Sequence, residues 1–446
     1  MFSSFLPHSI SVTSVYVGAL MRIPLFFFVF SFVLSAQAEL SDIEGKISEI
    51  ARGYKEPAVS LLEEVVNINS GTMNHNGVRQ VGDVFRRELD ALGMTTSWYD
   101  MGEVDRAGHL FAESGSGGAC QLLIGHLDTV FEPNSPFQTF QREGDFATGP
   151  GVNDMKGGNV VIVYALKALL EAGVLDQGQF IVALIGDEEK SGNPKSISRS
   201  HLIEAAERCD YALGFEIATS LSAATVARRG SSGWQLEVTG KQAHSSRIFS
   251  EDVGSGAIFE AARILNQFHA ELTGEQYLTF NPGLILGGTE VRHDAATNSG
   301  SAFGKSNVVS NRVVVQGGLR FISRAQLLKA RESMQRIVDN GHRPLTDASI
   351  SFADGYPAMS PTLGNQRLLS ILSRASEDLG YGPVEAYDPG KRGAADVSFV
   401  APYIDAIDGL GAEGQGAHSP EESIDLNTLP MLIERAALFM YRLAQQ

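Results

Sequence analysis

Several segments of this sequence end in side chains that bind metal ions or move protons. Hydrophobic runs and glycine-rich turns lead into His126, Asp128, Asp154, Glu188, Glu189, Glu216 and His418. Imidazole nitrogens and carboxylate oxygens are the ligands that hold zinc and similar divalent cations. Two imidazoles and three carboxylates suit a site for two such ions, and a further carboxylate is then needed to move a proton.

Short β-rich runs alternate with helical segments around these residues, which predicts an α/β domain with a largely parallel sheet. Residues 121–125 lead directly into His126, and at the strand period of two His126 and Asp128 project to the same side. Open α/β sheets bind ligands at such carboxyl ends of strands. Residues 149–158 form a glycine-rich turn with Asp154 just before a helix, and their spacing does not fit a Walker phosphate loop. Taken singly, each feature is as typical of solvated surface acids.

The apolar spacing indicates two further parts. Residues 41–93 carry apolar side chains at helical spacing. Residues 230–355 follow the order β-α-β-β-α-β, which predicts a ferredoxin-like unit inserted into an α/β domain made of residues 39–229 and 356–446. Within the insert, residues 287–306 are rich in glycine, serine, asparagine and threonine, and we expect a long loop there.

Charge balance and the N-terminus bear on partners and location. The 446 residues contain 35 Lys and Arg against 52 Asp and Glu, and a net charge of −17 argues against a nucleic-acid partner. An apolar run over residues 23–34 ends before Ser35-Ala36-Gln37-Ala38, which predicts a signal peptide over residues 1–38 and a periplasmic or secreted protein without a stable membrane anchor after cleavage. Met21 offers a second start, which would make residues 1–20 an upstream extension. The other interpretation of the run is an uncleaved anchor or a buried strand.

The sequence contains two cysteines, Cys120 and Cys209. Neither has a second cysteine at metal-binding spacing. An exported protein permits a disulfide between them, but the sequence alone leaves open whether they lie close enough to form one.

Five motifs in combination resemble a known family, the two-zinc exopeptidases that include glutamate carboxypeptidase (carboxypeptidase G), succinyl-diaminopimelate desuccinylase, acetylornithine deacetylase and aminoacylase. The motifs are His126-Leu127-Asp128-Thr129-Val130, Asn153-Asp154-Met155-Lys156-Gly157-Gly158, Asp187-Glu188-Glu189, Phe215-Glu216 and Ala417-His418-Ser419. The resemblance covers essentially the whole mature chain and is closest to the glutamate carboxypeptidases. It implies a three-layer catalytic domain, an inserted lid or dimerisation domain, and two Zn²⁺ ions, with Co²⁺ or Mn²⁺ as other metals.

The resemblance also implies a role for each residue of the motifs. Asp154 would bridge the two ions, with His126 and Glu216 on one ion and Glu189 and His418 on the other. Glu188 would be the general base and later the general acid. Asp128 would orient His126 through its far nitrogen, and a cis peptide bond would join Asp154 to Met155.

Residues of the insert match the family's substrate-binding positions. His244, in residues 239–245, resembles a histidine that polarises the scissile carbonyl, often from a partner subunit, which implies a possible homodimer through the insert. Asn307 and Arg320 match positions that hold the substrate's terminal carboxylate. Two departures leave the substrate open: a usual proline is absent near Ser310, and the 287–306 segment is longer than usual.

Residues 389–396 replace a glycine-rich segment of the family near the pocket, and their Lys391 and Arg392 would suit an acidic side chain. We therefore expect a zinc-dependent exopeptidase that hydrolyses an amide bond by a metal-bound hydroxide and releases C-terminal glutamate or a similar amino acid from a small peptide. One alternative is an N-acyl amino acid deacylase or desuccinylase, which shares the metal residues. An alternative of another class is an inactive ligand-binding homologue.

Overall fold

A computed structural model describes residues 40–446 of the chain. The predicted signal peptide, residues 1–38, lies outside the described residues. Within residues 40–446, no helix combines the length and the apolar composition that crossing a bilayer requires.

The N-terminal part forms three helices, as the apolar spacing of residues 41–93 predicts: α1 (Asp42–Arg52), α2 (Lys55–Val66) and α3 (His75–Ala91). A capping box begins α1, because the Ser41 hydroxyl accepts the backbone N–H of Glu44 while the Glu44 side chain accepts that of Ser41. The apolar faces of all three helices are buried in one core.

The central sheet has the strand order β1-β2-β6-β3-β7-β16. Its strands are β1 (Thr95–Met101), β2 (Arg106–Ser114), β3 (Cys120–His126), β6 (Gln179–Ile185), β7 (Tyr211–Gly214) and β16 (Asp405–Ile407). Strands β6, β3, β7 and β16 are parallel, and β1 and β2 add an antiparallel hairpin beside β6. The predicted parallel sheet is thus confirmed. Strands β1 and β2 were not predicted, because they follow the helical segment that the apolar spacing of residues 41–93 indicates.

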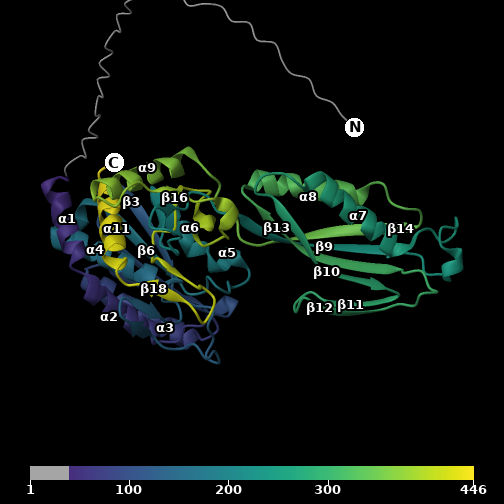
Figure 1. The fold of residues 1–446 in the computed structure, drawn as a ribbon, viewed down its shortest axis with the longest axis horizontal. Helices are drawn as coiled ribbons and strands as arrows, with labels where there is room; N and C mark the ends of the chain where they lie inside the picture. The colour runs from purple at the N-terminus through teal and green to yellow at the C-terminus, as the bar shows by residue number, and fades with distance from the viewer. Residues whose placement is uncertain (1–39) are drawn as a thin grey trace, which may run out of the picture. The chain divides into compact units, whose positions relative to one another are not determined.

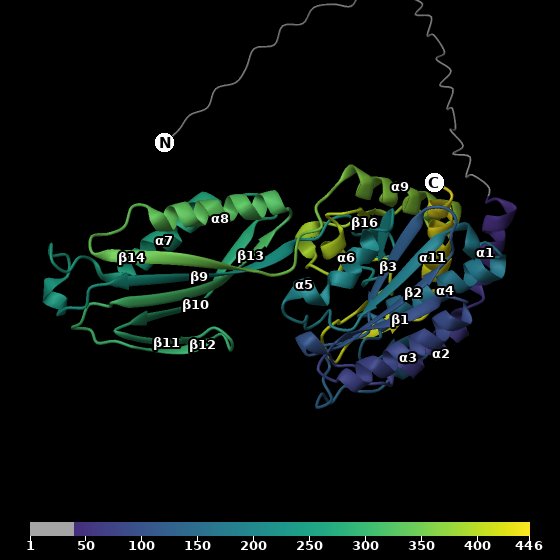
Figure 2. The same cartoon turned by 180° about the vertical axis from the view of Figure 1, so that it is seen from behind.

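Helices cover both faces of this sheet, which gives the three-layer α/β arrangement (Figure 1). The remaining helices of this part are α4 (Lys156–Ala172), α5 (Lys195–Ser198), α6 (Ser200–Ala206), α9 (Leu363–Asp378), α10 (Val397–Val400) and α11 (Leu429–Ala444). Consecutive residues of β3 alternate between two cores: Leu123 belongs to the core that contains α4 and α11, whereas Leu122 and Ile124 belong to the core that contains α6 and α10. From behind, α3 runs alongside β1 and β2 (Figure 2).

A small antiparallel sheet lies at the edge of this domain and joins segments far apart in sequence. It has the order β17-β18-β5-β4, formed by β4 (Gln141–Glu143), β5 (Phe146–Thr148), β17 (Gly414–Gln415) and β18 (Ser423–Asp425). A two-stranded pair, β8 (Ala223–Ala224) and β15 (Glu385–Ala386), completes this part. The turn that carries Asp154 follows β5, and His418 lies between β17 and β18.

The insert forms the ferredoxin-like unit that its element order predicts. Strands β9 (Gly230–Gly240), β10 (Thr279–Gly288), β13 (Arg312–Phe321) and β14 (Thr346–Asp354) form an antiparallel sheet in the order β10-β13-β9-β14, with α7 (Gly256–Leu272) and α8 (Arg324–Asp339) against it. The expectation of a long loop over residues 287–306 is wrong in part. Strands β11 (Glu290–Asp294) and β12 (Ser299–Phe303) form a hairpin there, because backbone pairing between them does not require apolar side chains.

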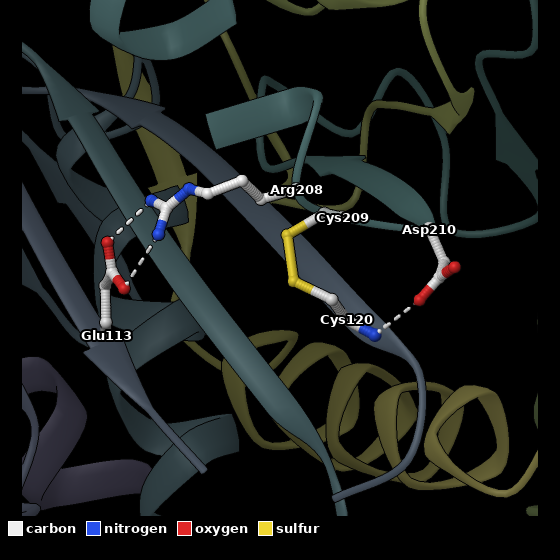
Figure 3. Close-up of a disulfide and its surroundings, with 5 residues drawn as sticks. All are labelled: Glu113, Cys120, Arg208, Cys209 and Asp210. Carbon is white, nitrogen blue, oxygen red and sulfur yellow. Dashed lines mark hydrogen bonds and ion pairs between the residues drawn. A yellow bond between two sulfur atoms is a disulfide. The ribbon is translucent and has the colours of Figure 1, made fainter. Parts of the chain in front are cut away.

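The two cysteines form a disulfide that ties two adjacent parallel strands (Figure 3). Cys120 begins β3, and Cys209 lies just before β7. The Asp210 carboxylate accepts the backbone N–H of Cys120 at 2.8 Å, and Arg208 pairs with Glu113 of β2 at 2.7 Å. The structure therefore answers the question that the sequence leaves open for this pair.

Candidate metal centre

Three parallel strands bring acids and a histidine to one edge of the central sheet. His126 ends β3, Glu188 and Glu189 follow β6, and Glu216 follows β7. Strand β3 lies between the other two, with His126 paired to Ile185. Because all three strands run in the same direction, their carboxyl ends meet at this edge.

The other two predicted ligands come from the small sheet. Asp154 lies in the turn between β5 and α4, and His418 lies in the β17–β18 loop with a left-handed backbone at φ 64°. The peptide bond between Asp154 and Met155 is cis, as the resemblance implies. A Cβ atom on Gly158 would lie 2.0 Å from the backbone oxygen of Phe215, so glycine permits the close approach of α4 to the strand end that carries Glu216.

Asp154 stands between the two histidines. Its Oδ1 lies 3.2 Å from His126 Nε2, and its Oδ2 lies 3.1 Å from His418 Nε2. His126 Nε2 is also 3.7 Å from a carboxylate oxygen of Glu216, and His418 Nε2 is 3.2 Å from one of Glu189. The structure thus brings all five predicted ligands together in two groups that share Asp154.

The cluster is largely enclosed. The side chains of His126 and Asp154 are 2% and 9% exposed, whereas that of His418 is 56% exposed, so the centre meets solvent on the His418 side. In two overlapping groups, ligand atoms lie within 4.8 Å of one another, close enough for one cation: His126 with Glu188 and Glu216, and His126 with Asp154 and Glu189. In the first of these, Glu188 occupies a position from which it too can offer a ligand atom.

Burial and close neighbours shift the pKa values of the cluster. Burial, and then the charge of Asp154, raises the pKa of Glu216 to about 7. Burial, with the charges of Glu216 and Asp396, raises the pKa of Glu188 well above its ordinary value. Hydrogen bonds to Asp154 and Glu189 raise the pKa of His418 to about 11. Glu189 Oε1 is buried without a hydrogen-bond partner. Carboxylates gathered this closely fit divalent cations, which would neutralise them.

Asp128 contacts the acidic loop as well as the histidine. Its buried carboxylate accepts the Thr72 hydroxyl at 2.6 Å and the backbone N–H groups of Glu188 and Glu189 at 3.0 and 3.1 Å. His126 Nδ1 lies 3.0 Å from the backbone oxygen of Asp128 and 3.5 Å from its carboxylate. The nearest polar partner of the ring is therefore the Asp128 carbonyl, and the carboxylate holds the Glu188–Glu189 backbone.

A buried ionic network supports the same loop, and motif reasoning did not find it. Arg199, fully buried, pairs with Asp187 and Asp396, and its guanidinium donates to the Asp187 carbonyl at 3.2 Å. The Tyr356 hydroxyl donates to the Glu188 carbonyl at 2.8 Å. The sequence offers no spacing that joins these residues, because Asp396 and Tyr356 lie 197 and 157 residues from Arg199 along the chain. Glu422, a buried acid four residues after His418, is another support that motif reasoning did not find.

The predicted residues of the insert lie on its two ends. His244 precedes a short helical turn, and its loop pairs with that of Asn307 through a backbone hydrogen bond from Ser245 to the Asn307 carbonyl at 2.9 Å. Both residues lie beyond the Arg312 end of β13, whereas Arg320 lies near the opposite end, paired with Ser231. Along β13, the eight residue steps from Arg312 to Arg320 span roughly 26 Å. Within the part of the chain that the structure describes, the side-chain hydrogen bond of His244 stays within its own loop.

Lys391 and Arg392 differ in their surroundings. Lys391 is exposed, whereas Arg392 is partly buried and its Nη2 donates to the Ile217 carbonyl at 3.3 Å, next to Glu216. Arg392 Nε is buried without a partner. Burial, and then the charge of Arg228, lowers the pKa of Arg392 to about 10. Of the two cations, Arg392 is thus the one beside the cluster with an unused donor.

Known proteins resemble the chain in sequence and in fold. Residues 122–442 match the profile of "Peptidase family M20/M25/M40". Carboxypeptidase G2 of Pseudomonas sp. (strain RS-16) is 28% identical over 395 residues, which cover 86% of this chain and 88% of that protein. A succinyl-diaminopimelate desuccinylase of Xanthomonas oryzae pv. oryzae (strain MAFF 311018) is 25% identical over 358 residues, covering 77% and 89%. Aminopeptidase PepT from Bacillus cereus ATCC 10987 has the same fold, with a TM-score of 0.70 at 19% identity over 87% of this chain and 99% of that one.

Proposed function

The chain belongs to peptidase family M20/M25/M40 and is a metallopeptidase of that family, and from this premise we propose that it is a carboxypeptidase that releases C-terminal glutamate or a similar amino acid from a small peptide. The observation that carries the proposal is the meeting of four predicted ligands from distant segments around the fifth, Asp154, with Glu188 beside them. The likeness to carboxypeptidase G2 supports the direction of cleavage.

We propose that the cluster holds two Zn²⁺ ions. Asp154 would contribute one oxygen to each ion, with His126 and Glu216 on one side and Glu189 and His418 on the other, because each imidazole faces a different oxygen of Asp154. Nitrogen and carboxylate donors suit zinc, and Co²⁺ or Mn²⁺ would fit the same set. Divalent cations at this position would polarise the scissile carbonyl and make water more acidic.

The chain's own residues would then move the proton. Glu188 would take a proton from the attacking water and deliver it to the departing nitrogen. Its raised pKa, caused by burial and by the charges of Glu216 and Asp396, suits a group that carries a proton near neutral pH. Asp128 would keep Glu188 in position through the backbone N–H group that its carboxylate accepts.

Recognition of the substrate would use cations on both parts of the chain. Arg392 has an unused donor beside Glu216 and would hold an acidic side chain, with Lys391 at the rim. Arg320 would hold the terminal carboxylate together with Asn307, and His244 would hydrogen-bond the scissile carbonyl. Because Arg320 lies near one end of the insert and His244 and Asn307 lie at the other, we propose that His244 and Asn307 come from a second copy in a homodimer. Exposed Phe249, Ile258 and Phe259 offer an apolar surface for it.

A second candidate activity is removal of an acyl group from an N-acyl amino acid. The similarity to a succinyl-diaminopimelate desuccinylase favours it, since the two activities would use the same metal residues. An inactive ligand-binding protein is a further alternative, which an amidase assay on the metal-loaded protein excludes if turnover is seen. The same purified material, treated with a chelator, should lose turnover and regain it with Zn²⁺.

We also propose that the protein is exported. The Cys120–Cys209 disulfide supports this, because such bonds persist in oxidising compartments. Fractionation of expressing cells, with N-terminal sequencing of the product, tests both export and the predicted start at Glu39.

A substrate panel tests the proposed activity. Peptides ending in glutamate should be cleaved with a higher kcat/KM than matched peptides ending in alanine, and N-acyl amino acids should be poor substrates. Arg392→Met should reduce the preference for glutamate about 10- to 100-fold, the effect of one charged hydrogen bond of about 1.5 to 3 kcal/mol. Lys391→Met is the matched control and should change it less. Equal preference for glutamate and alanine in the unaltered enzyme would reject the substrate assignment.

A further inference from the structure

We infer that Glu422 is a positioning residue of the metal centre, which fixes the Asp154 turn relative to His418 by binding its backbone N–H groups. The inference rests on the proposed ligand set, in which Asp154 and His418 share an ion. Glu422 contacts backbone, not the ions, so it would act through Asp154.

The contacts of Glu422 converge on the turn before α4. One carboxylate oxygen accepts the N–H groups of Asn153 and Asp154, both at 2.9 Å, and the other accepts that of Gly151 at 3.2 Å. Glu422 is fully buried. A carboxylate that accepts three N–H groups of one turn removes most of the freedom of that turn, because each hydrogen bond defines the direction of one peptide plane.

The backbone of Glu422 ties the same two segments. Its carbonyl accepts the N–H of Gly149 at 3.4 Å, and its own N–H donates to the Ser419 carbonyl at 3.0 Å. The next residue, Ser423, pairs with Thr148 at the end of β5. Glu422 therefore lies where the Asp154 turn and the His418 loop leave the small sheet, and it bonds to both.

This placement bears on the geometry of the site. Asp154 Oδ1 faces His126 and Oδ2 faces His418, an arrangement that depends on the direction of the Asp154 side chain and therefore also on the rotation of its backbone. With the N–H of Asp154 held by Glu422, that rotation is set before any ion binds. Supporting residues of this kind typically change metal affinity 10- to 100-fold when replaced.

The test compares metal binding by three glutamine variants. Glu422→Gln keeps the size of the side chain but turns one acceptor into a donor that faces backbone N–H groups. Glu434→Gln is the matched buried control: Glu434 is fully buried in α11 and bonds to Ser48, Tyr381 and Arg52, without contact to the ligand loops. Glu421→Gln is the exposed neighbouring control.

Metal-free protein of each variant is titrated with Co²⁺, followed by its visible absorption, and with Zn²⁺ in competition with a chromophoric chelator. We expect Glu422→Gln to bind at least one ion about 10- to 100-fold more weakly than the unaltered protein and to change the Co²⁺ spectrum. Both control variants should match the unaltered protein at temperatures where all are folded.

Unchanged affinity and spectrum in folded Glu422→Gln would overturn the inference, as would an equal loss in Glu434→Gln. Should Glu422→Gln not fold, Glu422→Asp replaces it, since the shorter side chain keeps the charge but cannot reach all three amides. Wild-type affinity in Glu422→Asp, or failure of both variants to fold, makes Glu422 a merely structural residue and overturns the inference. An unaltered protein that binds fewer than two ions instead rejects the proposed function.

Discussion

Replacing Glu188 by glutamine separates the proposed base from the proposed ligands. Glu188 and Glu189 are neighbours whose backbone N–H groups bind the same carboxylate of Asp128, yet only the Glu189 side chain lies within 3.2 Å of His418. Glu188→Gln should therefore keep both ions, whereas Glu189→Gln should lose affinity for one of them. The pair forms its own control, since both changes remove one charge from the same loop.

The expected magnitude follows from the role. A positioned general acid–base group typically contributes about 10²- to 10⁴-fold to the rate, or about 2.7 to 5.4 kcal/mol of transition-state free energy. Glu188→Gln should lower kcat by that factor with little change in KM. In the metal-free protein its folding stability should not fall at neutral pH, because the pKa of Glu188 is raised by burial and by Glu216, so the charged form opposes folding.

The assay combines metal analysis, kinetics and thermal unfolding on the same preparations. Two metal ions per chain, a kcat at least about 100-fold lower and an unchanged melting temperature of the metal-free protein are the expected results. Activity within about tenfold of the unaltered enzyme would remove Glu188 as the base. Loss of one ion in Glu188→Gln would instead make it a ligand, as its grouping with His126 and Glu216 permits.

Three further changes test the supporting structure. The Cys120–Cys209 disulfide spans 89 residues, so Cys120→Ala with Cys209→Ala should lower the free energy of unfolding in urea by about 4 to 5 kcal/mol, and a loss below about 1 kcal/mol would contradict this account. Burial lowers the pKa of His109 to about 4, from about 6.5 in the unfolded chain. The contribution of neutral His109 to the free energy of unfolding is therefore present above pH 6.5 and is lost as the pH falls toward 4, by about 3 kcal/mol. Metal-free His109→Gln should lose less stability than the unaltered protein over that pH range. Asp128→Asn sets an amide N–H₂ against the backbone N–H group of Glu188 or Glu189, so it should lower the free energy of unfolding by about 1 to 3 kcal/mol and lower kcat. Thr72→Val is the milder control, because it removes only one of the three hydrogen bonds that Asp128 accepts. Equal effects of the two changes would argue against the role of Asp128 in holding the Glu188–Glu189 loop.

Much of the fold was predictable because hydrophobic spacing reports burial. The helices of the N-terminal part, the parallel strands and the β-α-β-β-α-β order of the insert all carry regular apolar patterns. The hairpin of β11 and β12 was not predicted, since every residue of β12 is exposed and its composition is that of a loop. Strands β1 and β2 were also not predicted, although Trp98 and Tyr99 are typical strand residues.

The ligands were predictable for a different reason. Each follows a strand end or a glycine-rich turn, and the parallel direction of β3, β6 and β7 then requires their ends to meet. The side chains that support those ligands do not follow a strand end or a glycine-rich turn that would mark them in the sequence. Arg199 and Glu422 reach their partners across 12 and 268 residues respectively, and only the folded chain defines these contacts.

The two carboxylates that contact backbone suggest a common principle for this centre. Asp128 accepts the N–H groups of Glu188 and Glu189, and Glu422 accepts those of Asn153 and Asp154. In each case a buried acid from another segment binds two successive amides beside a proposed ligand. Side chains that face a cluster of like charge would otherwise turn toward solvent, because mutual repulsion opposes the arrangement until cations bind. Because Asp128 and Glu422 hold the backbone, the neighbouring ligand side chains can point in few directions, and their mutual repulsion remains in the metal-free protein. Binding of the ions relieves this repulsion, and that relief adds to the affinity for the ions.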